Sequence, residues 1–141
     1  MRRINEIIIH CTATRANQSV TLADIDRWHK ERGFKGIGYH YVIDTNGLIL
    51  VGRNEIEVGA HCEGRNLNSI GICYIGGLNA GDNHPEDTRT SQQKDAIIDL
   101  IKEIVNRHPI KLITGHNVYA NKKCPCFNAK EEYFHLIEEN A

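Results

Sequence analysis

Short apolar runs and helically spaced apolar residues follow one another along the chain, and together they predict about five strands and about three helices. Residues 6–10 form a β-branched run that ends at a histidine. Further strands are expected at 39–44, 48–52, 69–77 and 110–114. Apolar residues spaced three or four apart predict helices at 21–34, 91–108 and 129–139. Strands that alternate with helices indicate an α/β fold, with a central mixed sheet flanked by helices.

Polar residues at the ends of the helices support these boundaries. Thr21, with an aspartate three residues later, has the spacing of a capping box, and Gly33 marks the end of the first helix. Thr90 is expected to cap the second helix. The stretch 78–90 is rich in Gly, Asn and Asp and is expected to be a surface loop. Because core-forming elements lie on both sides of it, we expect residues 1–141 to form a single domain.

Composition and charge narrow the function classes. The 141 residues are 40% hydrophobic and 25% charged, and no apolar run approaches the roughly 18 residues that a membrane span needs. Seventeen basic and 18 acidic residues leave a net charge of -1, which provides no electrostatic footprint for nucleic acid or an anionic membrane. The first apolar run stops at His10 and lacks the features of a signal peptide, so we expect synthesis in the cytoplasm.

The five cysteines do not indicate a disulfide framework, because their number is odd and no secretion signal precedes them. Cys11 and Cys73 stand in or beside apolar runs and are expected to be small buried hydrophobes, a role that fits Cys62 less well. Cys124 and Cys126 flank a proline in the stretch NKKCPCFN. At least one thiol is therefore free.

Two histidines share a position that favours ligand binding. His10 and His116 each come directly after a predicted strand, at the edge of an α/β sheet where ligands collect. Cys124 follows eight residues after His116, and two histidines with one cysteine make three ligands, as in catalytic zinc sites. Spacing alone leaves two interpretations about even: a zinc site, or buried residues that are unrelated to one another.

The motifs of the chain, in their order and spacing, closely resemble those of one enzyme family. These motifs are IIIHCTAT, WHKERGF, GIGYHYVID, GLILVGRNEIEVGAHCEGRNLNSIGICYIGG, ITGHN and KKCPCFN, and the similarity extends from about Ile7 to about Phe134. They resemble the zinc-dependent N-acetylmuramoyl-L-alanine amidases, which include the short phage lysozymes that are in fact amidases. The peptidoglycan recognition proteins share this fold.

The resemblance implies a catalytic site with Zn²⁺ as its cofactor. His10, His116 and Cys124 match the zinc ligands of the family, Tyr39 its active-site tyrosine, and Lys122 its catalytic lysine. The substrate would be peptidoglycan, cut at the amide between the lactyl group of N-acetylmuramic acid and the L-alanine of the stem peptide.

The resemblance also implies a substrate groove and a biological setting. Arg53, His61 and the NLNSIG turn, which contains Asn68, fall in segments that line the binding groove of the family, and we expect Arg53, His61 and Asn68 to bind substrate. A phage or prophage endolysin, acting on the cell wall as a monomer after release from the cytoplasm, fits this interpretation. One departure from the family is Asn128, where relatives often carry an aspartate, so a possible carboxylate beside the site is missing.

Two other functions stay open from the sequence. The first is a protein that binds peptidoglycan without cutting it; such relatives commonly lack the cysteine ligand, whereas Cys124 is present here. The second is a cysteine hydrolase with Cys124 or Cys126 as nucleophile, which the intervening Pro125 and the absence of a predicted helix start make less favourable. Net charge near zero gives no indication for or against binding to a host polymerase.

The remaining aromatic side chains receive structural assignments. His40 follows Tyr39 in a predicted strand and is expected to point to the opposite side, as a core residue or one that supports the ligands. Trp28 lies at helical spacing with apolar neighbours and is expected in the core. We expect the histidines without a strand-end position to be on the surface; these are His29, His84, His108 and His135.

Overall fold

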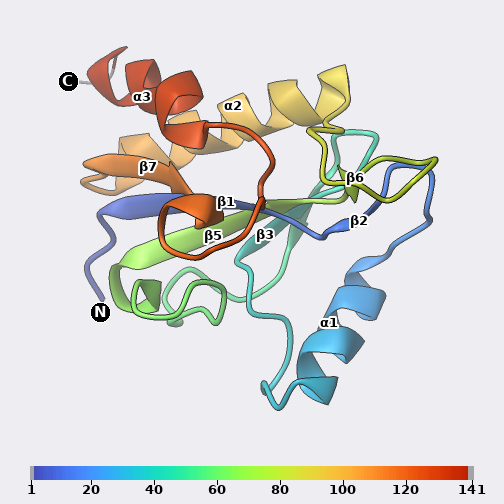
Figure 1. Cartoon of the computed structure of the whole chain (residues 1–141). Coiled ribbons are helices and arrows are strands. Elements are labelled where there is room, and N and C mark those ends of the chain that lie inside the picture. Colours follow the sequence, from blue (N-terminus) through green and yellow to red (C-terminus); the bar gives the residue numbers. More distant parts are fainter. Residues whose placement is uncertain (1, 140–141) are drawn as a thin grey trace.

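The computed structural model describes residues 2–139, and in this range a five-stranded mixed sheet forms the centre of the molecule (Figure 1). The strands are β1 (Glu6–Cys11), β3 (Tyr41–Ile43), β4 (Ile49–Val51), β5 (Ser69–Tyr74) and β7 (Leu112–Gly115). Their order across the sheet is β4-β3-β5-β1-β7. All neighbouring pairs are parallel except β3 with β4, which form the predicted hairpin. The predicted α/β class is confirmed.

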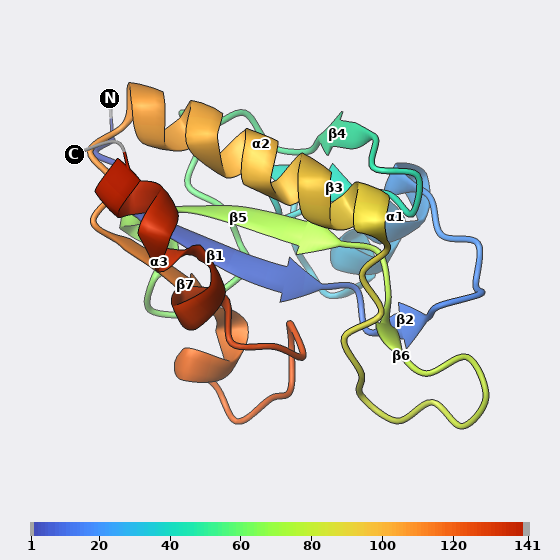
Figure 2. The same cartoon turned by 90° about the horizontal axis from the view of Figure 1, so that it is seen from above.

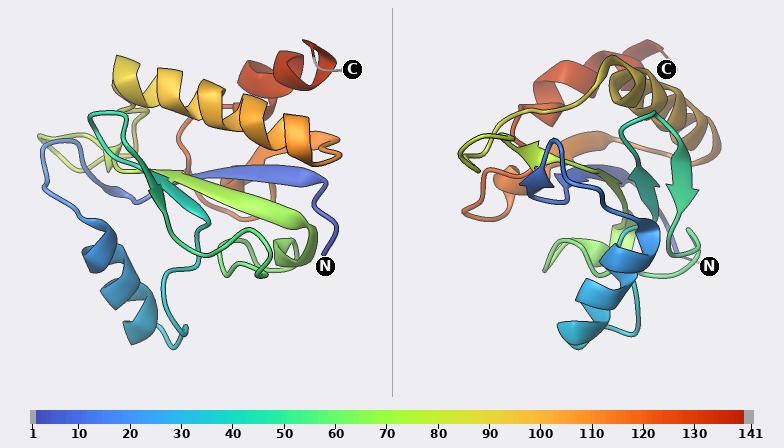
Figure 3. Two further views of the ribbon diagram at one scale, coloured as in Figure 1. Left: turned by 180° about the vertical axis from the view of Figure 1, so that it is seen from behind. Right: turned by 90° about the vertical axis from the view of Figure 1, so that its right-hand side faces the viewer.

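Helices cover the two faces of the sheet unequally. Helices α2 (Ser91–Arg107) and α3 (Ala129–Glu139) lie on one face, and α1 (Leu22–Glu31) lies on the other, as the view from above and the side views show (Figure 2 and Figure 3). None of the described helices is long and apolar enough to cross a membrane.

Alternation along the strands divides the side chains between the two faces. Ile7 and Ile9 belong to the large apolar core under α2 and α3, together with Ile97 and Ile101 of α2. The opposite face of β1 carries a buried polar side chain, that of His10. A smaller apolar cluster packs α1 against this second face through Ile25, Ile37, Val42, Cys73 and Ile75. The face opposite α2 and α3 is therefore the one that can hold a site.

The predicted helix caps are confirmed. The Thr21 hydroxyl accepts from the Asp24 N–H, and the Asp24 carboxylate accepts from the Thr21 N–H, so both halves of the capping box are made. Thr90 and Gln93 form the same arrangement at the start of α2. Gly33 follows α1 with φ +96°, a left-handed conformation that glycine adopts without steric cost.

Several short elements were not predicted. Strands β2 (Thr14–Arg15) and β6 (Gly77–Leu78) pair in parallel as a second small sheet, and β1 extends one residue further than expected. Two 3₁₀ turns adjoin strands of the main sheet: η1 (Asn66–Asn68) directly precedes β5, and η2 (His116–Val118) directly follows β7. Elements of two or three residues are too short to give a periodic pattern, which explains why sequence periodicity misses them.

The assignment of His29 to the surface is wrong. His29 is buried on the inner side of α1, where its Nδ1 accepts from the Gly38 N–H at 2.8 Å and its ring packs against Phe34. His84 and His135 are exposed as expected, whereas His108 is half-buried.

His108 owes its partial burial to an ion-pair cluster. Its Nε2 lies 2.7 Å from a carboxylate oxygen of Glu55, which Arg107 and Tyr41 also contact. Burial acts to raise the pKa of Glu55, but the hydrogen bonds from these partners outweigh it and lower the pKa to about 2. Trp28 is half-buried and packs against the smaller apolar cluster, at the margin of the core rather than inside it.

A buried arginine joins the loop before α2 to the C-terminal helix. The Arg89 side chain is 1% exposed and forms paired hydrogen bonds with the carboxylates of Asp87 and Glu132, at 2.7 to 2.9 Å. Its guanidinium also lies 3.4 Å from the centre of the Phe127 ring and donates to the Tyr133 hydroxyl. Arg89 thereby fixes the segment that follows Cys126, from which the candidate site is partly built.

We expect Arg89→Met to lower the free energy of unfolding by about 3 kcal/mol, because the methionine keeps the volume but leaves two carboxylates and a buried hydroxyl without their partner. Urea denaturation measures this loss. Arg27→Met is the matched control: its side chain is 60% exposed in an ion pair with Asp24, so the loss should stay below about 1 kcal/mol. Equal losses for the two variants would contradict the role given to Arg89.

Candidate active site

The two strand-end histidines meet because their strands are parallel neighbours. His10 is near the carboxyl end of β1, and His116 opens the η2 turn directly after β7. Parallel strands bring these ends to the same edge of the sheet. The ring centroids are 4.7 Å apart, and one ligand atom each of His10, His116 and Cys124 lie within 4.8 Å of one another. The three residues predicted to bind a metal therefore converge.

Cys124 reaches this edge in a loop that is tied to two strands. The Tyr74 hydroxyl of β5 donates to the carbonyl of Pro125 at 2.6 Å, and the Cys11 N–H of β1 donates to the sulfur of Cys124 at 3.1 Å. The thiol of Cys126 points away from the ligand set and donates to the Gly77 carbonyl at 3.4 Å. The two thiols of the CPC motif thus have different roles, one in the ligand set and one in packing.

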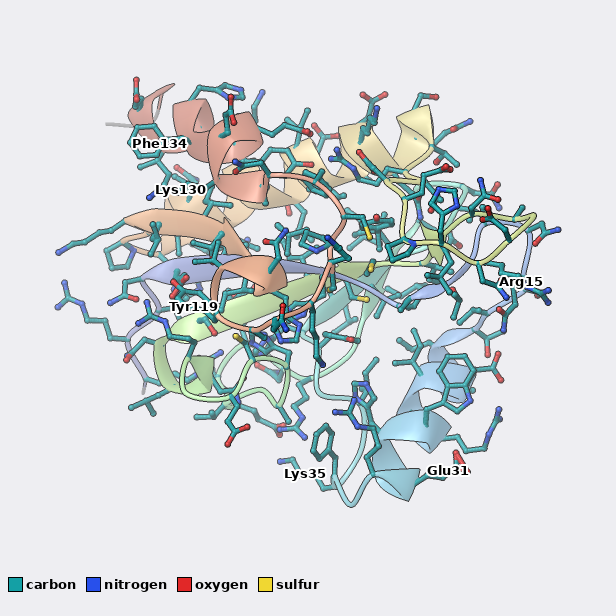
Figure 4. The ribbon with its side chains drawn as sticks, in the orientation of Figure 1. Arg15, Glu31, Lys35, Tyr119, Lys130 and Phe134 are labelled. Atoms are coloured by element: carbon teal, nitrogen blue, oxygen red, sulfur yellow. The ribbon has the colours of Figure 1, made fainter. Side chains whose placement is uncertain are left out.

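A buried carboxylate fixes the η2 turn. Glu6, at the start of β1, is 2% exposed and accepts from Thr114 of β7 at 2.7 Å and from the Tyr119 hydroxyl at 2.5 Å. Arg65 donates to the same carboxylate at 2.8 Å, and its guanidinium lies 4.6 Å from the centre of the Tyr119 ring. Figure 4 shows Tyr119 beside the turn that begins with His116. The network holds His116 at its place against β1.

The two histidines among the candidate ligands have the neutral state that metal binding requires. Burial, with smaller effects from His61, His116 and Lys122, lowers the pKa of His10 well below its usual range, so the imidazole is neutral. Burial also lowers the pKa of His116. Among the described residues 2–139, no hydrogen bond engages either ring nitrogen of His116 or Nδ1 of His10. Lone pairs on both histidines are therefore available.

A cleft of about 690 Å³ opens over this edge of the sheet. Tyr39, with its ring 5.2 Å from that of His10, and the exposed Lys122 both line it; these are the two residues for which the resemblance implies a catalytic role. Burial and the neighbouring thiols raise the pKa of the Tyr39 hydroxyl well above its ordinary value, so it keeps its proton. A protonated phenol and a lysine side chain therefore line the same cleft as His116 and Cys124, two of the three candidate metal ligands.

Known proteins with this arrangement identify the family. The family model described as N-acetylmuramoyl-L-alanine amidase matches residues 1–127. The chain belongs to this family. The endolysin of Enterobacteria phage K11 is 38% identical over 124 residues, which make up 88% of this chain and 82% of that protein. The chain is thus a phage-type N-acetylmuramoyl-L-alanine amidase, as predicted.

Solved structures agree with this identification. The N-acetylmuramoyl-L-alanine amidase LysC from Clostridium intestinale URNW matches with a TM-score of 0.81 and 30% identity, over 99% of this chain and 86% of that chain. A mutant of Drosophila PGRP-LB, in complex with tracheal cytotoxin, matches with a TM-score of 0.77 and 26% identity, over 94% and 81%. The predicted fold, shared by amidases and peptidoglycan recognition proteins, is confirmed.

The three residues predicted to bind substrate occupy different places in this amidase. His61 lines the cleft, but it is 8% exposed and its Nδ1 lies 2.8 Å from Nε2 of His10. Arg53 donates to the carbonyls of Ile37 and Val58, both at 2.8 Å, and is not part of the cleft lining. Asn68 is not part of the lining either; its side-chain amide donates to the Arg3 carbonyl.

Asn66, the first residue of the NLNSIG turn, and His29, which was expected on the surface, also line the amidase cleft. Asn66 stands two positions before Asn68, and its side-chain oxygen accepts from the N–H groups of His61 and Cys62, which shapes the loop beside the cleft. His29 lines the cleft from α1, with its ring 5.1 Å from that of Tyr39. The pattern of α1 places His29 beside Trp28, but only the tertiary packing shows that it faces the site.

Asn128 has a local structural role that explains the departure from the family. Its side-chain oxygen accepts from the Glu131 N–H at 3.0 Å, and its amide donates to the Glu131 carboxylate at 3.3 Å. The first bond is that of a helix N-cap, a position for which asparagine is as suitable as aspartate. Asn128 therefore caps α3 and does not face the ligand set.

Acid should destabilise the metal-free amidase through its buried histidines. Burial lowers the pKa of His40 to about 4, whereas the unfolded chain keeps a value of about 6.5. Below pH 6.5 the unfolded chain binds a proton that the folded chain does not. The free energy of unfolding should therefore fall by up to about 1.4 kcal/mol per pH unit, from about pH 6.5 to about 4, through His40 alone.

Urea denaturation with a chelator at several pH values tests this prediction. The Gly71 N–H donates to Nδ1 of His40 at 3.0 Å, and in the His40→Asn variant the asparagine side chain can accept the same hydrogen bond. The free energy of unfolding of this variant should fall less on acidification than that of the wild type. His135→Asn, at an exposed position, is the control. A wild-type slope in the His40→Asn variant would be the contrary result.

Proposed function

We propose that the chain hydrolyses the amide between the lactyl group of N-acetylmuramic acid and L-alanine with one zinc ion, held by His10, His116 and Cys124. The observation that carries this proposal is the convergence of these three ligand atoms beside Tyr39 and Lys122. We also propose that the chain acts as a monomer on cell-wall peptidoglycan after release from the cell that makes it.

The donor set supports zinc as the metal. Two imidazole nitrogens and one thiolate are ligands that zinc favours, and three protein ligands leave a fourth position open, as catalysis requires. Zinc–nitrogen and zinc–sulfur bonds of about 2.0 and 2.3 Å keep tetrahedral ligand atoms roughly 3.3 to 3.6 Å apart. Ligand atoms that already lie within 4.8 Å need to move by only about an ångström to reach these bond lengths.

The surroundings of Cys124 support a thiolate ligand. The Cys11 N–H donates to its sulfur at 3.1 Å, and a hydrogen bond of this kind stabilises negative charge on an acceptor. A hydrogen bond with Cys124, together with burial, raises the pKa of the Cys11 thiol, which therefore stays protonated beside the ligand.

The residues around the proposed ion divide the remaining tasks of amide hydrolysis. Zinc bound there supplies a Lewis acid that polarises a carbonyl and makes water a stronger nucleophile at neutral pH. Tyr39 keeps its phenolic proton and donates a hydrogen bond to the carbonyl oxygen as negative charge develops on it. Lys122 adds positive charge at the open side of the cleft. The cleft volume of about 690 Å³ suits a ligand of several residues or sugar rings.

The zinc hypothesis predicts that a strong chelator and His10→Ala each abolish cleavage of purified peptidoglycan, whereas His84→Ala, at an exposed histidine, does not. Mass spectrometry of the digest should show muramic acid freed from L-alanine, and elemental analysis should find about one zinc per chain. Full activity in the His10→Ala variant would show that the ligand assignment is wrong.

The same assay separates the other two functions. Activity that survives the chelator but is lost on alkylation with iodoacetamide would indicate a cysteine hydrolase. Muramyl-peptide binding without product over hours would indicate a binding protein. Neither outcome is expected, because Cys124 sits in a ligand set rather than at a helix start that would activate a nucleophile.

Tyr39→Phe should lower kcat roughly 100- to 1,000-fold, because one donor to the developing oxyanion is lost. KM should change much less, since the ring stays in place. Steady-state kinetics on a soluble muramyl peptide measures both constants. Tyr41→Phe is the matched control, because the Tyr41 hydroxyl bonds to Glu55 and is not part of the cleft lining.

The proposed role of Lys122 can be tested against the neighbouring lysine, Lys123. Lys122→Met should lower kcat, and Lys123→Met, at the exposed neighbouring position, should not. Equal kcat values for Lys122→Met and the wild type would remove Lys122 from the mechanism.

A further inference from the structure

His61 makes a contact that neither substrate binding nor packing explains. Its Nδ1 lies 2.8 Å from Nε2 of His10, and the two rings meet edge to face with centroids 4.9 Å apart. Nε2 of His61 lies 3.3 Å from the Ser69 hydroxyl, and that hydroxyl lies 2.8 Å from the carbonyl of Arg65. A continuous chain of hydrogen bonds thus begins at a backbone carbonyl and ends on His10.

The direction of every bond in this chain follows from its first member. The Arg65 carbonyl can only accept, so the Ser69 hydroxyl donates its single hydrogen there. The Ser69 oxygen is then left as an acceptor, and His61 must donate to it from Nε2–H. A neutral imidazole with its proton on Nε2 carries a bare Nδ1, which accepts from Nε2–H of His10. The lone pair of His10 is thereby placed on Nδ1.

The protein provides a slot that fits an imidazole at this position. A Cβ on Gly71, in the middle of β5, would lie 2.6 Å from the His61 ring, and a Cβ on Gly59 would lie equally close to it. Glycine weakens the interior of a strand, so its presence there indicates the close approach of another group. His61 is therefore held in place by the backbone on two sides.

We infer that His61 is a positioning residue, which with Ser69 fixes the tautomer and the orientation of His10 so that Nδ1 binds the metal. This inference rests on the proposed zinc site. It replaces the expectation that His61 binds substrate. Bonds of this kind orient metal ligands, and loss of the partner typically weakens metal binding by roughly 10- to 100-fold.

Zinc affinity, measured by competition with a chromophoric chelator, tests the inference without using activity. His61→Leu, which fills the slot but cannot accept a hydrogen bond, should bind zinc roughly 10- to 100-fold more weakly than the wild type. His61→Asn places a side-chain oxygen where Nδ1 was and should recover most of the affinity. Ser69→Ala should cause a smaller loss, because it leaves the direct partner of His10 in place.

His40→Leu is the matched control. His40 is buried next to His61, with ring centroids 5.8 Å apart, and a Cβ on Gly59 would crowd both rings. His40 does not contact His10 in the described structure, so its loss should reduce stability without changing zinc affinity in the folded chain. Equal weakening by His40→Leu and His61→Leu would assign the effect to packing and overturn the inference.

Nitrogen NMR of the wild-type chain gives a second readout that does not depend on any variant folding. In the zinc-loaded protein we expect the imidazole proton of His61 on Nε2, and His10 with its proton on Nε2 and the metal on Nδ1. A proton on Nδ1 of His61, or zinc on Nε2 of His10, would overturn the inference. If the wild type binds no zinc, the proposed function fails; if His61→Leu binds zinc as tightly as the wild type, only this inference fails.

Discussion

Parallel pairing of β1 with β7 is the constraint on which the rest of the site depends. The register matches Glu6 with Leu112 and Ile9 with Gly115, so the residues that follow the two strands emerge together. A shift of one residue would turn His10 toward the large apolar core and away from His116 and Cys124. Glu6 reinforces the register from the other end of β1, because it bonds to both β7 and the segment after it. The register of the β1–β7 pair therefore determines the geometry of the site.

The two faces of the sheet divide stability from chemistry. The face under α2 and α3 buries isoleucines almost continuously and supplies most of the apolar core. The opposite face buries several histidines, including His10, His40 and His61, in a neutral state. Neutral imidazoles can be buried there because each has a defined partner or a place in the ligand set. Metal ligation requires the same neutral state, so the needs of folding and of binding agree.

Local sequence signals predicted the elements and part of the site. His10 and His116 were found from their place after apolar strands, and the caps at Thr21 and Thr90 from residue spacing alone. For Cys124, spacing alone did not decide between a zinc ligand and an unrelated buried residue, and only the resemblance to the family favoured the ligand. The loop before Cys124 has no periodic pattern that would show which part of the sheet it contacts. His29 was wrongly assigned to the surface for a related reason: the Gly38 N–H that its ring accepts belongs to the loop after α1, which no local pattern reveals.

The buried arginine before α2 has a consequence for how this domain can be shortened. The family model ends at residue 127, and every proposed ligand and catalytic residue lies within that limit. Glu132 and Tyr133, however, hold the Arg89 guanidinium against Phe127, just beyond the CPC motif. A chain that ends at residue 127 would keep the proposed ligands and catalytic residues. It would lose the partners of Arg89 in α3, and with them the contacts that hold the segment after Cys126 in place. We therefore expect the shortest active chain to include α3, beyond the residues that the family model matches.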